Sequence, residues 1–483
     1  MNNIKYNLEK ARKYEVENMD IINDDKKPLI HLSSPIGWIN DPNGFSVFKD
    51  EYHLFCQYHP YSKAWGPMHW AHFKSKDLIK WEHLPVALAP DTNYDSFGCF
   101  SGSAIDDNGK HILMYTGVIK DDEKERQTQC IAIGDGINYK KLEQNPIIKG
   151  DILPKGSSLV DFRDPKIWKE DDTFYSVVAN RAEDGSGQIA LFSSKNLIDW
   201  EFKNIILSCN NELGKMWECP DFFELDNKHF LILSPQEMEQ QGLEYHGGNC
   251  NVYTVGDYDK NKFIFNKHNT QALDYGLDFY APQTTITSDG RRVLVGWMQS
   301  WDNHMTPYEF GWSGIMSIPR QLVYKNDRLY QIPVEEIKNY YKDTITIQKY
   351  IENETFEDKR LFSRTFDLVV EIDVNDLDEF IINFAKNQRY NTKFIYKCKE
   401  QLAIFDRNGA GIRKDCLNER KINITSIDNK LNIRIIVDKY TVEIFLNNGY
   451  KTMSSLIYTN MEANQISFEV KGKSNIIINQ NLF

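Results

Sequence analysis

Three acidic residues stand one or two positions before a proline in separate stretches of the 483-residue sequence: Asp41 in NDPNG, Asp164 in RDP and Glu218 in ECP. If such carboxyl groups were brought together, they could hydrolyse a glycosidic bond. That reaction uses one carboxylate that attacks the sugar and one carboxylic acid that protonates the leaving oxygen. The two groups need environments that push their pKa values apart.

Each motif also has a purely structural explanation when it is taken alone. NDPNG is a strong turn sequence, and proline keeps Asp164 out of the α region. A glutamate between Trp217 and Cys219 could be a buried, ion-paired carboxylate. The coincidence of all three acids in similar contexts favours the catalytic interpretation.

The immediate neighbours predict different charge states for these acids. Backbone N–H groups of the turn after Asp41 are expected to keep that carboxylate ionised. Glu218 has Trp217 and Cys219 as neighbours, and this poorly hydrated setting predicts a raised pKa. Arg163 is expected to hold Asp164 ionised.

The three stretches are copies of a longer repeat. Each has an acid, a proline, an apolar run, an acidic turn and a second apolar run, and weaker copies begin near residues 100 and 281. Five hairpin units of about 60 residues predict a five-bladed β-propeller over residues 30–325. A β-sandwich with similar hairpins is the alternative. Because the first strand of each propeller blade lines the axis, the three acids are expected at equivalent points around one funnel.

The remaining residues form other units. All ten Trp lie between Trp38 and Trp312, and the sequence beyond shows period-2 apolar patterns. We therefore expect an all-β protein in which an antiparallel β-sandwich at 345–483 follows the propeller. Residues 1–29 are expected to form a helical extension, and residues 326–344 a linker helix.

Charge and cysteine content exclude several classes of function. The formal net charge of −12 disfavours nucleic acid and anionic membranes as partners. No apolar run has the length of a membrane span, and no signal peptide is recognisable. The eight cysteines lack metal-ligand spacing, so we expect free thiols in the cytoplasm and neither a metal nor another cofactor.

The motifs resemble those of glycoside hydrolase family 32, the β-fructofuranosidases. The similarity runs through GWINDPNG, FCQYHP, FSGSA, FRDPK, WECPDFF and, near the C-terminus, DKYTVEIFLNNG, so it covers nearly the whole chain. It implies a five-bladed propeller with a β-sandwich and retaining hydrolysis of terminal β-fructofuranosides. It further implies that Asp41 is the nucleophile, Glu218 the acid/base and Asp164 the residue that binds fructose hydroxyls.

The resemblance also implies a set of substrate-binding residues. By position these are Trp38, Asn40, Gln57, Trp65, Phe100, Ser101, Arg163, Cys219, Tyr280 and Trp297. Phe100 departs from the pattern, because many members of the family carry Trp there. The alternative for Trp65 and Phe100 is a place in the core between blades, and Gln57 could satisfy only backbone groups.

The function expected from these observations is hydrolysis of a small, sucrose-like β-fructoside. Sucrose, sucrose 6-phosphate and short fructo-oligosaccharides all remain open as substrates, as do a monomer and a homodimer. A fructosyltransferase with the same three acids is the nearest alternative, and inverting arabinosidases or xylosidases share the fold type. A sugar-binding lectin with an inactive site is the alternative outside enzymes.

Overall fold

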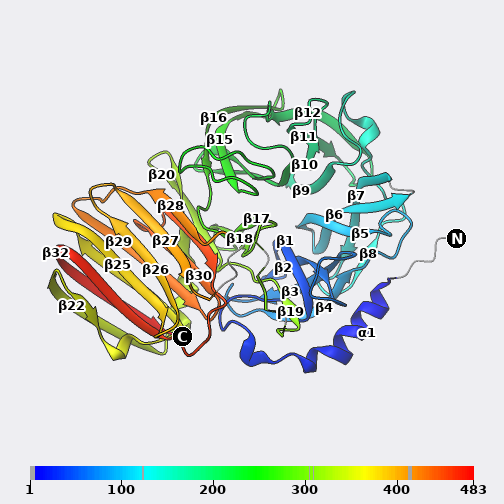
Figure 1. Ribbon diagram of the computed structural model, residues 1–483. Helices are drawn as coiled ribbons and strands as arrows, with labels where there is room; N and C mark the ends of the chain where they lie inside the picture. The colour runs from blue at the N-terminus through cyan, green and yellow to red at the C-terminus, as the bar shows by residue number, and fades with distance from the viewer. Residues whose placement is uncertain (1–5, 122–123, 304, 308, 412–415) are drawn as a thin grey trace.

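Five sheets, each built on four antiparallel strands, surround a central axis, and a separate body of strands packs against one side of this ring (Figure 1). The computed structural model describes residues 6–121, 124–303, 305–307, 309–411 and 416–483. The expected propeller followed by a β-sandwich is therefore confirmed. Within the blades, turns such as Lys49–Asp50 reverse the chain with residues at positive φ.

The blades follow one another around the ring in the order of the sequence. Their strands are β1 (Gly37–Phe48), β2 (Glu51–His59), β3 (His69–Ser75) and β4 (Glu82–Leu88); β5 (Gly98–Asp107), β6 (Lys110–Asp121), β7 (Lys124–Gly134) and β8 (Tyr139–Lys141); β9 (Phe162–Glu170), β10 (Thr173–Arg181), β11 (Gly187–Ser194) and β12 (Trp200–Ser208); β13 (Trp217–Leu225), β14 (Lys228–Pro235), β15 (Val252–Asp259) and β16 (Ile264–Ala272); and β17 (Tyr280–Ile286), β18 (Arg292–Trp297), β20 (Arg320–Lys325) and β21 (Arg328–Pro333). The short strand β19 (Trp312–Ser313) pairs in parallel with β1.

Every innermost strand carries one extra residue at the same level. The register shifts between Ile39 and Pro42 in β1, and the corresponding shifts in the other blades are Phe100/Gly102, Arg163/Lys166, Glu218/Asp221 and Tyr280/Gln283. These are β-bulges, which redirect side chains and are typical of strands beside active sites. Proline is tolerated there because a bulge residue needs no ladder hydrogen bond.

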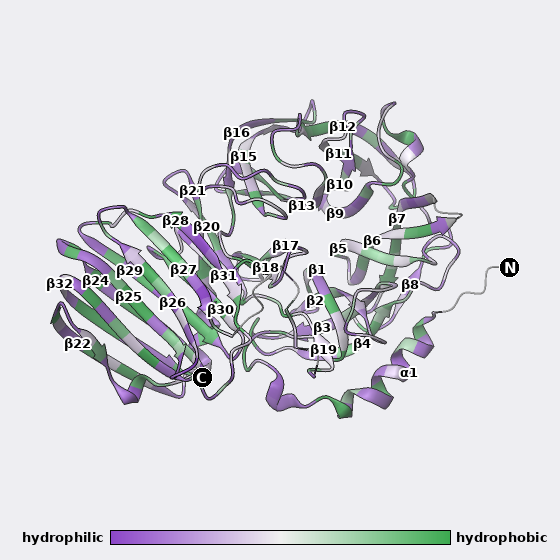
Figure 2. Ribbon diagram, viewed as in Figure 1, coloured by the Kyte–Doolittle hydropathy of each residue, from purple (hydrophilic) through white to green (hydrophobic). Residues whose placement is uncertain are grey.

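The C-terminal strands form the sandwich. They are β22 (Asp343–Glu352), β23 (Thr355–Glu357), β24 (Thr365–Asp373), β25 (Asp376–Lys386), β26 (Asn391–Lys397), β27 (Leu402–Gly409), β28 (Glu419–Asn423), β29 (Lys430–Asp438), β30 (Thr441–Leu446), β31 (Lys451–Leu456) and β32 (Gln465–Leu482). Apolar residues alternate with polar ones along much of strands such as β24 and β29, which produces the banded hydropathy colouring of this body in Figure 2. The long strand β32 pairs with β25 through its first half and with β24 through its second half.

Two of the expected segment limits differ from the structure. The fifth blade continues past residue 325, because its outer strand β21 ends at Pro333. The expected linker helix is only a short 3-10 helix, η4 (Glu335–Tyr340). The N-terminal extension contains α1 (Leu8–Asn18), which runs along the outside of the first blade in Figure 1. Further 3-10 turns are η1 (Met19–Ile21), η2 (Asp24–Lys26), η3 (Gly150–Ile152) and η5 (Lys359–Leu361).

A buried network of charges joins the propeller to the sandwich. The Asp438 carboxylate accepts the backbone N–H of Ile30 at 2.8 Å and lies 3.0 Å from His31 Nδ1. His31 Nε2 lies 2.9 Å from Glu443 Oε1, and Glu443 Oε2 accepts from Arg320 Nε at 3.0 Å. Burial by itself would lower the pKa of His31, but these two carboxylates outweigh it and raise the pKa to about 9. The imidazole is therefore a cation at neutral pH.

Loss of the His31 proton should weaken the folded state at alkaline pH. Because the folded-state pKa lies above the ordinary value of 6.5, the stabilisation is complete below that pH and is lost as the pH rises through about 9. His31→Gln should lower the free energy of unfolding by about 3 kcal/mol near neutral pH, since it leaves buried carboxylates without their cation. It should also flatten the decline in stability between about pH 6.5 and 9.

Urea unfolding across this pH range measures both effects. His268→Gln is the matched control, because the His268 side chain is nearly half exposed and pairs with a surface aspartate. The interpretation is wrong if His31→Gln and the wild type lose stability in parallel as the pH rises.

Candidate active site

The innermost strands surround a cavity of about 360 Å³ at one end of the propeller axis. The three predicted acids all face it. The lining residues are Asn40, Asp41, Gln57, Trp65, Phe100, Ser101, Glu125, Gln127, Val160, Asp161, Arg163, Asp164, Glu218, Gln236 and Trp301.

The repeat suggested that the three acids occupy equivalent positions in their strands, but they do not. Glu218 is the last paired residue before its bulge, whereas Asp164 and Asp41 lie within theirs. Arg163 and Tyr280 share the position of Glu218 in the two adjacent blades. The bulges therefore direct different side chains of neighbouring blades to one point.

Asp41 is buried and lines the cavity. Ser101 Oγ donates a hydrogen bond to Asp41 Oδ2 at 2.8 Å, and Gln57 Nε2 donates to the Ser101 hydroxyl at 2.8 Å. No hydrogen bond of ordinary geometry reaches Asp41 Oδ1 from the described residues. Burial, with the nearby charge of Glu218, raises the pKa of Asp41 to about 6. The expectation that turn N–H groups keep this pKa low is wrong, but the group is still mainly ionised at neutral pH.

Glu218 is held from three directions. Arg163 Nε donates to its Oε1 at 3.0 Å, while Gln236 Nε2 and the Tyr280 hydroxyl donate to its Oε2 at 2.8 Å and 2.6 Å. This setting is polar rather than apolar, contrary to the expectation. The large neighbour Trp217 is buried away from the carboxylate and donates to the Leu213 carbonyl.

Asp164 adopts a positive φ of 64°, which is strained for a residue with a side chain. Its Oδ2 accepts the backbone N–H of Cys219 at 3.0 Å. Burial raises the pKa of Asp164 to about 7; Arg163 opposes this shift, and the charges of Glu218 and Asp41 add to it. The sequence suggested that Arg163 keeps the pKa of Asp164 low, but it does not.

Cys219 separates two of the acids. Its Sγ lies 3.8 Å from Asp41 Oδ2 and 3.6 Å from Asp164 Oδ2. Burial raises the pKa of this thiol well above its ordinary value, so the sulfur stays uncharged between the two carboxyl groups.

The predicted substrate-binding residues divide into two groups. Those that line the cavity are Asn40, Gln57, Trp65, Phe100, Ser101 and Arg163. Trp65 is 43% exposed, which excludes the alternative of a core position. Trp38, Cys219, Tyr280 and Trp297 are buried behind this lining; the Trp38 indole, for example, donates to Asn40 Oδ1 at 2.7 Å.

Sequence reasoning missed several lining residues. They are Glu125, Gln127, Val160, Asp161, Gln236 and Trp301. The repeat gave no signal for them: Gln236 lies just beyond the end of β14, whereas Gln57 lies two residues before the end of β2. Asp161 and Gln127 both accept hydrogen bonds from Arg163 Nη1, at 2.8 Å and 3.3 Å.

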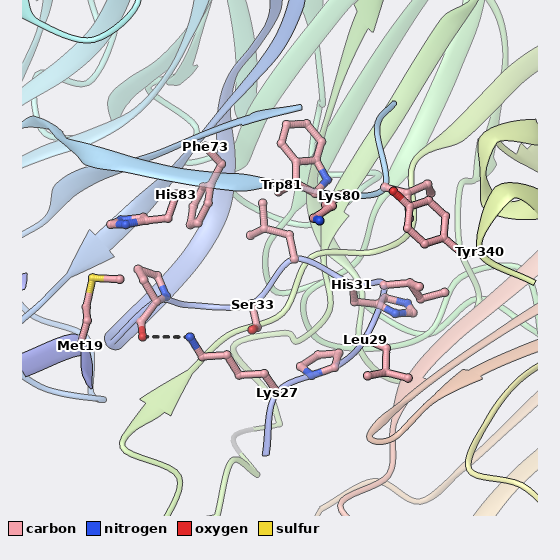
Figure 3. A pocket seen from close by; sticks show the side chains of 15 residues that line it. Met19, Lys27, Leu29, His31, Ser33, Phe73, Lys80, Trp81, His83 and Tyr340 are labelled. Carbon is pink, nitrogen blue, oxygen red and sulfur yellow. Dashed lines mark hydrogen bonds between the residues drawn. The ribbon is translucent and has the colours of Figure 1, made fainter. Parts of the chain in front are cut away.

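A second cavity, of about 380 Å³, lies between the N-terminal extension, the first blade and η4 (Figure 3). Figure 3 shows Lys27, His31, Trp81 and Tyr340 around it. Its lining residues, all within the described ranges, include no Asp or Glu. This cavity therefore lacks the paired carboxyl groups of the axial one.

Other chemistries find little support in the described part of the chain. No group of three or more His, Cys, Asp or Glu side chains there is arranged to hold a metal ion. His53 and His72 are buried and hydrogen-bonded to each other at 2.8 Å. No helix within the described ranges has the length and apolar composition needed to cross a bilayer.

Comparison with known sequences decides the family. The profile of the glycosyl hydrolases family 32 N-terminal domain matches residues 31–333, and that of the family's C-terminal domain matches residues 336–482. The chain belongs to glycosyl hydrolase family 32. The predicted resemblance is thus confirmed, and this family 32 chain is a glycosidase.

Relatives of the family 32 chain match it over nearly their full length. A sucrose-6-phosphate hydrolase of Escherichia coli is 36% identical over 91% of this chain and 91% of its own. A raffinose invertase of the same species is 34% identical over 91% of each chain. The structure of a mutant GH32 β-fructofuranosidase of Bombyx mori in complex with sucrose superposes with a TM-score of 0.86, at 31% identity, over 100% of this chain and 98% of that one.

Proposed function

We propose that this family 32 enzyme hydrolyses terminal, non-reducing β-D-fructofuranosides such as sucrose and sucrose 6-phosphate, and releases fructose with retention through a fructosyl-enzyme. The observation that carries the proposal is the convergence of Asp41, Asp164 and Glu218 on one cavity, with a different set of partners for each. The names of the relatives support the substrate class.

In the first step, Asp41 attacks C2 of the fructosyl ring and Glu218 protonates the departing glycosidic oxygen. With a pKa of about 6, Asp41 is ionised at neutral pH, and Oδ1 has no competing hydrogen bond from the described residues. Ser101 fixes the other oxygen of the nucleophile. The bond from Asp41 to C2 forms while the bond from C2 to the leaving oxygen breaks.

In the second step, Glu218 accepts a proton from water, which displaces Asp41 from C2. Arg163, Gln236 and Tyr280 hold the Glu218 carboxyl in place for both proton transfers. Asp164, with a pKa near neutrality, can both donate to and accept from fructose hydroxyls.

A sugar acceptor in place of water would make the same site a fructosyltransferase, so product analysis distinguishes hydrolysis from transfer. A cytoplasmic location completes the proposal.

Asp41→Asn should lower kcat by several orders of magnitude on sucrose without changing the thermal unfolding midpoint by more than a few degrees. The substitution removes the nucleophile but keeps the shape of the side chain. Purified protein assayed for fructose release checks this. Activity above a few per cent of wild type would exclude Asp41 as the nucleophile.

Glu218→Gln should separate acid catalysis from binding. It should abolish sucrose cleavage but spare the first step on β-fructofuranosyl fluoride, because fluoride departs without a proton. The fructosyl-enzyme should then accumulate, since no base activates water, and added azide should release it as fructosyl azide. Rapid-quench and mass-spectrometric measurements follow both species. Equal losses on sucrose and the fluoride, with no response to azide, would leave Glu218 without this role.

The acidic limb of the pH profile should report Asp41. Because Asp41 must be ionised to attack, kcat/KM should fall below about pH 6. The charge of Glu218 raises the pKa of Asp41, so Glu218→Gln should move the limb to lower pH with the fluoride substrate. Glu125→Gln is the control: it removes another carboxylate of the cavity, yet the limb should stay in place. An unmoved limb in Glu218→Gln would contradict the coupling.

A further inference from the structure

The cavity is strongly acidic. Its lining includes five carboxyl side chains and a single arginine, Arg163. Arg163 already donates to Glu218 and Asp161. A phosphate monoester carries a charge of about −1.5 to −2 near neutral pH, so the lower part of this cavity repels it. A phosphate on the leaving group must therefore lie at the mouth, beside another cation.

Lys120 lies on the cavity side of the hairpin formed by β6 and β7. It stands directly opposite Glu125 in the register, and Val118, two residues earlier, stands opposite Gln127. Directly paired residues share a face of a sheet, as do residues two apart. Since Glu125 and Gln127 line the cavity, Lys120 is on the same face, two pairs closer to the tip of the hairpin than Val118 and Gln127.

A series of aromatic rings connects Lys120 to the lining of the cavity. Lys120 Nζ lies 5.8 Å from the ring centroid of Phe97. That ring lies 6.3 Å from the Trp65 ring and 6.4 Å from the Phe100 ring, both of which line the cavity. Lys120 is exposed, and no carboxylate of the described residues forms an ion pair with it.

Lys63, in the loop that carries Trp65, is the competing cation. Its Nζ donates to the Pro307 carbonyl at 3.0 Å; partial burial lowers the pKa of Lys63, and the charge of Glu309 opposes this shift. The amino group of Lys63 is thus already used by its own neighbours. Lys120 is the better placed of the two to receive an anionic group.

We propose that Lys120 binds the phosphate of a phosphorylated leaving group and thereby sets the preference of the enzyme for sucrose 6-phosphate over sucrose. The inference rests on the proposed function, because it assigns the leaving-group side of the same cavity. Lysine binds phosphate as a point charge. The negative charge of Glu125, directly across from Lys120 in the sheet, repels the phosphate. Gln127 Nε2 donates a hydrogen bond to Glu125 Oε1 at 2.8 Å.

Steady-state kinetics of Lys120→Met on both substrates tests the inference. For sucrose 6-phosphate, kcat/KM should fall about tenfold, mostly through KM, because a partly exposed ion pair with a dianion is lost. For sucrose, kcat/KM should stay within about twofold, since that leaving group has no charge to bind. Lys120→Arg, which keeps the positive charge, should retain most of the wild-type kcat/KM for sucrose 6-phosphate. Added salt should raise KM for sucrose 6-phosphate in the wild type more than in Lys120→Met.

Arg126→Met is the matched control. It removes the same charge from the neighbouring position on the opposite face of β7, where the side chain is exposed, so it should leave the ratio of the two substrates unchanged. The inference would be overturned if Arg126→Met lowered kcat/KM for sucrose 6-phosphate as much as Lys120→Met does, or if Lys63→Met lowered it instead. It would also be overturned if Lys120→Met affected both substrates equally. Sucrose cleavage would then still support the proposed function. A wild type that cleaves neither substrate would overturn both.

Discussion

One extra residue in each innermost strand determines where the chemistry can occur. An unbroken pleat would turn successive side chains to opposite faces and would present the same kind of position from every blade. The bulge interrupts this alternation and turns Asp41 and Asp164 toward the axis, while Glu218 arrives from the residue just before its own bulge. Asp164 and Cys219 accept positive φ for this purpose, a strain that the surrounding strands must hold. The prolines of the motifs occupy the same irregular turns.

Burial and charge compete within the cavity that the bulges create. Removing Asp41 and Asp164 from water raises the pKa of both, and the negative charge of Glu218 raises them further. Arg163 is the main positive counterweight, but its hydrogen bonds go to Glu218 and Asp161. The result is that Asp41 and Asp164 have pKa values of about 6 and about 7. Such a pair is poorly stabilising for the fold and well suited to chemistry near neutral pH.

The sequence was most informative where a motif and a repeat agreed. The acid-proline motifs marked the bulges, and their spacing marked the blades, so the three acids and the ring could be predicted together. The environment of Glu218 could not, because Trp217 and Cys219 are neighbours along the strand while the groups that contact the carboxylate, such as Arg163 and Tyr280, come from adjacent blades.

The end of the propeller was misjudged for a related reason. Strand β18 ends at Trp297 and β20 begins only at Arg320, and between them β19 joins the first blade rather than the fifth. This long excursion breaks the repeat period that located the other blades. Trp301, which lines the cavity, lies in the same excursion and outside every motif. Trp301 reaches the cavity because of the path of this long segment, which no local sequence pattern predicts.

The charge network between the two domains has a kinetic consequence. His31 is separated by 407 residues from Asp438 and by 412 from Glu443 in the sequence. Contacts this distant in sequence form only after a large loss of chain entropy. Until they form, the His31 cation and its carboxylate partners remain hydrated and the facing surfaces are unpaired. We therefore expect the domains to dock late in folding, and a molecule in which they have not yet docked exposes both surfaces to aggregation.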